Sequence, residues 1–267
     1  MVKNGEDRLC VDYRELNVNT VRDHYPLPLI SEQLDQLAEA KYFTCLDMAA
    51  GFHQIPIEPN SIEKTAFITP DGQYDYLTMP CGFTNAPSVY QRAINKALGD
   101  LRGKTALVYM DDILIPSKTI VEAIAKLELV LEALAKAGFA INKKECAFLK
   151  SAIEYLGFMV SNGKIRPSPT KVEALAKSPP PTNIKQLRQF NGLAGYFRCF
   201  IPRFSTELVP LYNLTKLGAT WEWTPKHEAV RSKIIKYLTS APLLTICKSV
   251  TQQNYIPMLI LSDLEQF

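Results

Sequence analysis

The 267-residue sequence lacks any apolar run that approaches the roughly 20 residues of a membrane-spanning helix, and no secretory leader opens it. It also lacks C-x-x-C pairs and ligand-like histidine spacing, so its six cysteines match neither a zinc site nor a disulfide framework. Repeats and low-complexity segments are absent as well. We therefore expect a soluble intracellular protein with reduced thiols, neither secreted nor bound to a membrane.

A strong charge bias is also missing, because 30 basic residues face 27 acidic ones and the net charge is only +3. This balance neither requires nor excludes a nucleic-acid partner, since the distribution of the charges decides their effect. With 47% hydrophobic residues, the chain is long enough for two modest domains or one elongated domain.

Hydrophobic periodicity predicts an α+β fold over the first 165 residues. Strands are expected at "RLCVDYREL", "YFTCLDM" and "YLGFMVS", and strand pairs around Pro70-Asp71-Gly72 and within "TALVYMDDILIPS". Helices are expected after Pro28, from Asn85 to Leu101, and from Ile120 to Leu134, the last stopping at Gly138. This order predicts a mainly antiparallel sheet with helices packed on one face.

A domain boundary is expected near residues 165–182, where Pro179, Pro180 and Pro181 form a stiff extended linker. The following sequence is mostly helical in pattern. Helices are predicted over 183–200, 206–217 and 226–238.

The adjacent aspartates Asp111 and Asp112 lie between two apolar strand segments. They could be the polar tip of an ordinary hairpin, since aspartate is a common turn residue. Carboxylates against a core are costly, however, unless a cation compensates them. A third carboxylate, Asp47, also ends an apolar strand. If these strands are neighbours, the three carboxylates meet at one sheet edge and suit Mg²⁺, which favours phosphoryl transfer with two metal ions.

Several ordered blocks resemble the reverse transcriptase of gypsy-type long-terminal-repeat retrotransposons, part of a Pol polyprotein. They are "RLCVDYRELN", "YPLPLI", "FTCLDMAAGFHQI", "KTAF", "LTMPCGFTNAPSVYQR", "VYMDDILIPS", "YLGFMVS" and "PPTNIKQLRQFNGLAGYFRCFIPRFS". The resemblance implies a right-hand polymerase fold. Residues 1–165 would hold the palm and partial fingers (about 1–41 and 56–86), 166–246 a linker and helical thumb, and 247–267 a truncated start of a connection or RNase H-like region.

The resemblance also implies roles for individual residues. Asp47, Asp111 and Asp112 would be catalytic and would hold two Mg²⁺ ions, with Mn²⁺ as the alternative. Nucleotide-binding positions would be Lys3, Arg8, Ala50, Gly51, Phe52 and Met110, with Phe52 excluding a 2′-hydroxyl. Template and primer positions would be Asp12, Arg14, Gly82, Pro87, Tyr109, Leu156, Gly157, Lys185 and Arg188.

The implied partners are an RNA/DNA template–primer duplex and deoxynucleoside triphosphates. A homodimer, or the RNase H and integrase parts of a parent polyprotein, are further candidate partners, in a cytoplasmic particle or the nucleus. The chain departs from the family at Ala49, where Lys or Arg is usual, and at Pro116, which is tolerable only at a strand edge. Two readings stay open, namely an active polymerase and an inactive fragment that folds and at most binds nucleic acid. An RNA-dependent RNA polymerase is disfavoured by Phe52 and by the order of the blocks.

Overall fold

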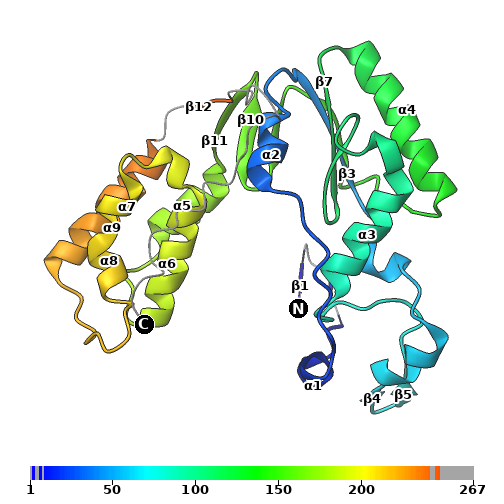
Figure 1. Ribbon diagram of the computed structural model, residues 1–267, viewed down its shortest axis with the longest axis horizontal. Helices are drawn as coiled ribbons and strands as arrows, with labels where there is room; N and C mark the ends of the chain where they lie inside the picture. Colours follow the sequence, from blue (N-terminus) through cyan, green and yellow to red (C-terminus); the bar gives the residue numbers. More distant parts are fainter. Residues whose placement is uncertain (1, 4–5, 8, 241–243, 247–267) are drawn as a thin grey trace, which may run out of the picture.

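A four-stranded antiparallel sheet, here called the palm sheet, lies in the right-hand part of Figure 1, beside α3 and α4. The computed structural model describes residues 2–3, 6–7, 9–240 and 244–246. The strand order of the palm sheet is β6-β7-β3-β8. The bounds are Leu107–Tyr109 for β6, Asp112–Ser117 for β7, Tyr42–Asp47 for β3 and Ala147–Lys150 for β8.

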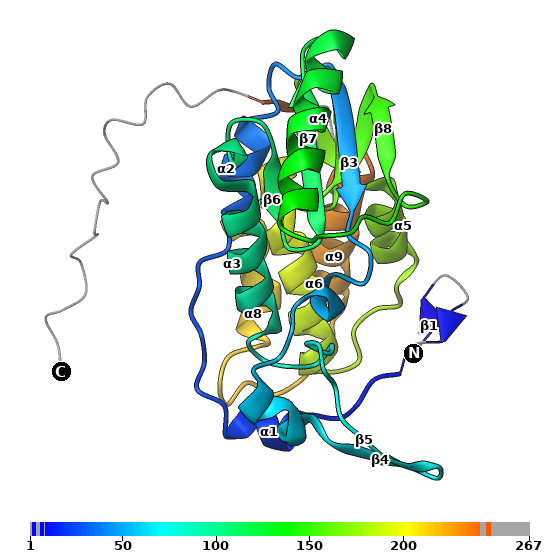
Figure 2. The same cartoon turned by 90° about the vertical axis from the view of Figure 1, so that its right-hand side faces the viewer.

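Helices α3 (Ala86–Leu98) and α4 (Ile120–Lys136) cover one face of this sheet (Figure 2). Both predicted helices are confirmed, and the core between them and the sheet includes Leu46, Ile113 and Tyr90. Ile120 and Ile124 of α4 are nevertheless about half exposed, at 47% and 49%. Both residues lie in the first two turns of α4, whereas Val130 and Leu134, further along the helix, are buried.

A second sheet of order β12-β11-β10-β9 lies beside the palm sheet, next to α2 (Figure 1). The bounds are Ala152–Tyr155 for β9, Phe158–Ser161 for β10, Lys164–Pro167 for β11, Leu244–Thr245 for β12 and Ile30–Asp35 for α2. One core cluster runs from Phe43 and Leu114 of the palm sheet through Tyr155 and Phe158 to Phe197 of the helical part.

The helical part contains α5 (Pro169–Lys177), α6 (Ile184–Tyr196), α7 (Phe204–Glu207), α8 (Val209–Asn213) and α9 (Pro225–Thr239) (Figure 1). The single helix predicted over 206–217 is wrong. The chain forms two short helices there, because Pro210 has no backbone N–H to continue a helix and lies in the first turn of α8. Helix α5 was not predicted. The Asn183 side chain caps α6 by accepting from the Gln186 N–H at 3.0 Å.

The predicted strand over "RLCVDYREL" is wrong. Residues 9–13 form neither helix nor strand, and α1 (Arg14–Val18) follows. The Asp12 carboxylate accepts from the Arg14 backbone N–H at 3.1 Å, a local bond that competes with strand pairing. Tyr13 is buried, and its hydroxyl donates to the Thr65 carbonyl at 3.0 Å. This bond fixes the segment to the 3₁₀ helix Pro59–Thr65.

Two short hairpins complete the described elements: β1 (Val2–Lys3) with β2 (Glu6–Asp7), and β4 (Phe67–Thr69) with β5 (Gly72–Tyr74). The second confirms the hairpin predicted at Pro70-Asp71-Gly72. Among the described residues, no helix is both long and apolar enough to cross a membrane. The region predicted for residues 247–267 lies outside the described residues, and the predicted domain boundaries stay predictions.

Pro116 lies within β7 opposite Phe43, at a point where β6 has already ended. Its carbonyl accepts from the Lys126 ammonium group at 2.7 Å, so this edge of the strand is turned away from β3. The missing N–H of Pro116 therefore costs the palm sheet no ladder bond, as the edge-strand rule requires.

Candidate active site

Two of the three predicted carboxylates face each other across the palm sheet. Asp47 is the last residue of β3, and Asp112, the first of β7, lies directly opposite it. Asp111 is the residue before Asp112, in the turn that joins β6 to β7. Like charges directly opposite each other destabilise an antiparallel pair, so this end of the sheet is a place where a cation would be stabilising.

Asp111 is directed to the side of the sheet that α3 covers. A Cβ built on Gly51 would lie 2.4 Å from Asp111 Oδ1 and 3.0 Å from the Tyr90 hydroxyl oxygen. That hydroxyl is buried and has no hydrogen-bond partner within the described residues. Burial raises the pKa of Tyr90, and the nearby charges of Asp111 and then Asp47 raise it further. Asp47 and Asp111 thus both act on one buried, neutral hydroxyl.

Asp112 acts on the opposite side of the sheet. Burial raises the pKa of Cys45 to about 12, with Asp112 and then Asp47 as the next causes. Burial also raises the pKa of Tyr155, and Asp112 is the next cause there. Neighbouring side chains of an extended strand alternate between faces, which explains why Asp111 and Asp112 diverge.

Asp47 therefore acts on groups on both sides of the sheet, while Asp111 acts on the α3 side and Asp112 on the other side. Within the described ranges, no group of three or more His, Cys, Asp or Glu side chains is placed to hold a metal ion. Mg²⁺ sites that also bind substrate phosphates often use only one or two protein carboxylates. Asp47 and Asp111 fit such a site, and a metal role for Asp112 stays a prediction.

The loop after Asp47 is held against residues 140–142. The Gln54 side chain donates to the Ala49 and Ala140 carbonyls at 2.7 and 2.9 Å and accepts from the Ala140 N–H at 2.7 Å. Ala50 adopts the left-handed conformation, with φ of 49°, and starts the 3₁₀ helix Gly51–Gln54. Phe52 is half-buried and meets Tyr90 edge to face, with ring centroids 5.5 Å apart. The structure therefore places Gly51 beside Asp111 and Phe52 beside Tyr90, and the nucleotide-binding roles of Ala50, Gly51 and Phe52 stay predictions.

Two buried glutamines that the sequence pattern did not indicate hold the hairpin of β6 and β7. Met110, with φ of 51°, donates its backbone N–H to Gln91 Oε1 at 2.8 Å. Gln33 of α2 donates to the Val108 carbonyl at 2.8 Å and accepts from the Tyr155 hydroxyl. Both glutamines are polar residues within helices, a pattern that is common on solvated faces and gives little signal in the sequence. Tyr109 ends β6 opposite Asp112.

The predicted template-side residues lie around the start of α3. Gly82 has φ of 102°, which strongly favours glycine, and Pro87 lies in the first turn of α3. Asp12 and Arg14 pair with each other at 2.6 Å on the exposed surface rather than meeting the aspartates. Lys3 lies in β1, and Arg8 lies outside the described residues, so the roles predicted for both stay predictions.

The predicted primer-side hairpin joins β9 to β10. Leu156 and Gly157 both have positive φ, 47° and 76°, the geometry of a tight two-residue hairpin turn. The Tyr196 hydroxyl of α6 donates to the Leu156 carbonyl, and the Lys171 ammonium group lies 5.5 Å from the centre of the Tyr196 ring. This turn is thus fixed to the first long helix after the linker.

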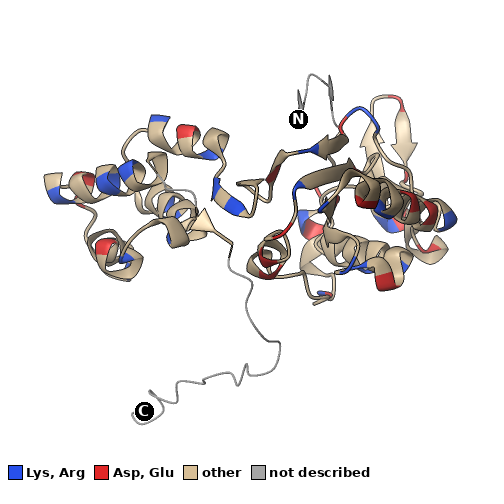
Figure 3. Ribbon diagram, turned by 90° about the horizontal axis from the view of Figure 1, so that it is seen from above, with Lys and Arg blue, Asp and Glu red and all other residues tan. Residues whose placement is uncertain are grey.

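The helical part has an excess of basic over acidic residues. Residues 166–240 contain 12 Lys and Arg but only four acidic residues, which are Glu173, Glu207, Glu222 and Glu228. Figure 3 shows the basic positions spread over these helices. Lys185 and Arg188 are exposed on α6, as a phosphate-contacting role requires, and Arg188 also donates to the Thr215 carbonyl at 3.4 Å.

An antiparallel sheet backed by two helices, with carboxylates at the end of one strand and in the adjacent hairpin turn, is the arrangement that the resemblance to reverse transcriptases implies for the palm. The family model described as "Reverse transcriptase (RNA-dependent DNA polymerase)" matches residues 3–160. The chain belongs to this family.

Relatives with curated names agree with this family. The chain is 43% identical over 209 residues to a retrovirus-related Pol polyprotein from transposon 297 of Drosophila melanogaster, covering 78% of this chain and 20% of that protein. It is 37% identical over 213 residues to the corresponding polyprotein from transposon gypsy of the same organism, covering 80% and 21%. The chain thus spans about a fifth of the length of these relatives.

Solved structures confirm the right-hand polymerase fold. A foamy viral protease-reverse transcriptase in complex with double-stranded DNA matches with a TM-score of 0.82 and 28% identity, over 92% of this chain and 43% of that one. A foamy viral protease-reverse transcriptase in complex with an RNA/DNA hybrid matches with a TM-score of 0.77 and 28% identity, over 89% and 32%.

Proposed function

We propose that this chain is the polymerase part of a retrotransposon reverse transcriptase and copies an RNA or DNA template into DNA. The observation that carries the proposal is the joint placement of Asp47 and Asp111 beside the Gly51–Phe52 loop at the end of the palm sheet. In the reaction, the primer 3′-oxygen bonds to the α-phosphorus of a deoxynucleoside triphosphate. The α–β phosphate bond breaks, pyrophosphate leaves, and the 3′-hydroxyl gives up its proton.

Asp47 and Asp111 would hold Mg²⁺, which supplies a lowered pKa for the attacking hydroxyl and charge neutralisation for the leaving group. The chain itself supplies position. Gly51 lets the loop approach Asp111 closely, and Phe52, fixed by Tyr90, presents an aromatic face that leaves no room for a 2′-hydroxyl. Orienting the two reactants accounts for much of the catalysis in reactions of this kind.

Two further features support binding of a template–primer duplex. The basic helices of residues 166–240 offer cations to a phosphate backbone, and the Leu156–Gly157 turn is fixed to them through Tyr196. The names of the matched foamy viral structures include an RNA/DNA hybrid and double-stranded DNA, which is consistent with such a duplex here. We place this activity inside the cell, in a cytoplasmic particle or the nucleus.

The test is Mg²⁺-dependent incorporation of dTTP on a poly(A) template primed with oligo-dT. Asp111→Asn should abolish incorporation, while Asp71→Asn, the same change in the exposed β4–β5 turn, should leave it unchanged. Thermal unfolding would show that both variants fold. Full activity of Asp111→Asn would overturn the proposal. A folded wild-type chain that binds duplex in a salt-dependent manner without incorporation would favour the inactive, nucleic-acid-binding fragment instead.

A further inference from the structure

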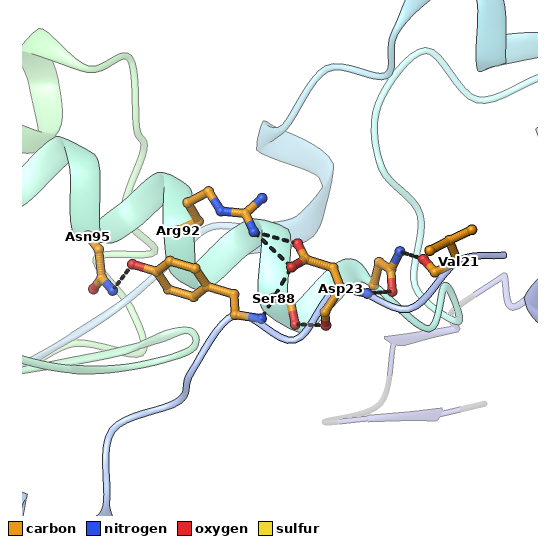
Figure 4. Close-up of polar contacts among 7 residues, drawn as sticks. Val21, Asp23, Ser88, Arg92 and Asn95 are labelled. Atoms are coloured by element: carbon orange, nitrogen blue, oxygen red, sulfur yellow. Dashed lines mark hydrogen bonds and ion pairs between the residues drawn. The ribbon is translucent and has the colours of Figure 1, made fainter.

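A polar stripe along α3 joins residues 21–25, the extended segment before α2, to the hairpin of β6 and β7. Figure 4 shows this stripe from Val21 to Asn95. The Asn85 side chain donates to the Val21 carbonyl at 2.8 Å, and the Ser88 hydroxyl donates to the Asp23 carbonyl at 3.0 Å. Arg92 binds both Asp23 carboxylate oxygens, at 2.7 and 2.8 Å. The extended segment is therefore attached to the residue that precedes α3 and to the first two turns of the helix.

Tyr25 occupies the end of this stripe. Its backbone N–H donates to Asp23 Oδ1 at 3.2 Å, and the Arg92 guanidinium lies 4.9 Å from the centre of its ring. Its hydroxyl accepts a hydrogen bond from Asn95 Nδ2 at 2.9 Å. The ring and the backbone of Tyr25 are thus fixed independently of the hydroxyl.

From Asn95 the hydrogen bonds continue to the hairpin. Gln91 Nε2 donates to Asn95 Oδ1 at 3.0 Å, and Gln91 Oε1 accepts from the Met110 N–H at 2.8 Å. Gln91 and Asn95 are both buried, at 0% and 9% exposure, so water competes little for these groups. Tyr25 is thereby connected to the residue that immediately precedes Asp111.

These hydrogen bonds form one series that runs from Tyr25 through Asn95 and Gln91 to Met110. The Met110 N–H fixes which group donates and which accepts in each bond. A backbone N–H can only donate, so Gln91 must present its oxygen to Met110 and its NH₂ group to Asn95. Asn95 must then accept with its oxygen and present its own NH₂ group to residue 25. The series is complete only if residue 25 can accept, as the tyrosine oxygen does and a phenylalanine ring does not.

We propose that Tyr25 and Asn95 are positioning residues for the polymerase reaction, acting through Gln91 on the Met110–Asp111 turn. Without the Tyr25 acceptor, the Asn95 amide can rotate and place its NH₂ group against that of Gln91. Gln91 then turns its own NH₂ group toward the Met110 N–H, and two donors face each other. Met110 already holds a left-handed conformation that non-glycine residues rarely adopt, so the loss of this bond releases the turn.

The experiment compares Tyr25→Phe with Ser88→Ala, a matched control that removes one bond between α3 and the same segment outside the series. The first readout is amide exchange of Met110 in protein labelled with ¹⁵N-methionine. The chain has only six methionines, so few signals need to be assigned. We expect Met110 exchange to be about three- to tenfold faster in Tyr25→Phe, as for the loss of one hydrogen bond, and unchanged in Ser88→Ala.

The second readout rests on the proposed function. Tyr25→Phe should lower the rate constant of incorporation about three- to tenfold, with the KM for the nucleotide and the duplex affinity unchanged. In a double-mutant cycle with Asn95→Leu, the combined loss should not exceed the larger single loss, because both changes break one series.

Unchanged Met110 exchange in Tyr25→Phe would overturn the inference, as would equal effects of Tyr25→Phe and Ser88→Ala. If the wild-type chain incorporates no nucleotide, the proposed function fails but the exchange comparison still decides whether the series acts on Met110. If Tyr25→Phe does not fold, Asn95→Leu gives the same exchange comparison.

Discussion

Replacing Gly51 by alanine should impair the candidate active site through the loss of space alone. Gly51 is buried, and its φ lies outside the left-handed region, so alanine can adopt its backbone conformation. The added Cβ, however, would lie 2.4 Å from Asp111 Oδ1 and 3.1 Å from Tyr90 Cζ. The Tyr90 ring is fully buried between Phe52 and Phe139, with centroids at 5.5 and 6.2 Å, so it has little room to move. The carboxylate of Asp111 must therefore give way.

The size of the effect follows from this contact. Forcing a methyl group into a packed site costs about 1–3 kcal/mol of folding free energy. A displacement of about 1 Å in a catalytic group can cost on the order of 100-fold in rate. Because Asp111 Oδ1 has to retreat by a substantial part of that distance, we expect Gly51→Ala to lower incorporation by about 10- to 100-fold.

Urea unfolding and primer extension would measure the two effects separately. For stability, the matched control is Gly192→Ala in α6, where a Cβ would meet no described atom within 4 Å. This control should raise the free energy of unfolding by about 0.5–1 kcal/mol, the usual gain from glycine to alanine within a helix. Wild-type incorporation and wild-type stability in Gly51→Ala would refute the steric reasoning, since they would show that Asp111 does not depend on the space at Gly51.

Two further predictions concern buried polar groups. The side-chain amide nitrogen and oxygen of Asn191 in α6 are both buried without a hydrogen-bond partner in the described part of the chain. Asn191→Leu should therefore raise the free energy of unfolding in urea by about 1–3 kcal/mol. A loss of stability would instead reveal a partner for the amide. The pKa of Tyr90 is raised above its usual 10.0 chiefly by burial, so above pH 10 the unfolded chain loses this proton first and the free energy of unfolding falls as the pH rises. Tyr90→Phe should reduce this fall in the free energy of unfolding between pH 10 and 11 by up to about 1.4 kcal/mol. The same pH dependence in the variant and the wild type would contradict the prediction.

Local patterns in the sequence predicted much of the fold. The apolar period around Tyr90 and Ile94 identified α3, and Pro70-Asp71-Gly72 identified the β4–β5 turn, because both signals depend only on neighbouring residues. The strand predicted at residues 8–16 failed for the opposite reason. A strand needs a partner, and the segment instead forms a local bond from Arg14 to Asp12 and a distant one from Tyr13 to Thr65.

The candidate site was predictable in its residues but not in its arrangement. The strand pattern placed Asp47 and Asp111 near one another, and the structure agrees. It could not show which groups the two adjacent aspartates act on, Tyr90 for Asp111 and Cys45 and Tyr155 for Asp112, because these groups come from distant parts of the chain. The conformation of that turn rests on Gln91, which contacts it from 19 positions earlier in the chain.

The residues that fix the backbone around Asp47 and Asp111 are all glutamines, and their lack of charge matters for the site. Gln54 holds the loop after Asp47, Gln91 holds the turn before Asp111, and Gln33 holds β6 at Val108. Each side chain offers both a donor and an acceptor while carrying no charge. A lysine or arginine in these positions would offset the negative charge that a bound cation needs, and another carboxylate would add repulsion. Neutral amides can therefore fix the backbone around Asp47 and Asp111 without adding a charge of either sign to the site.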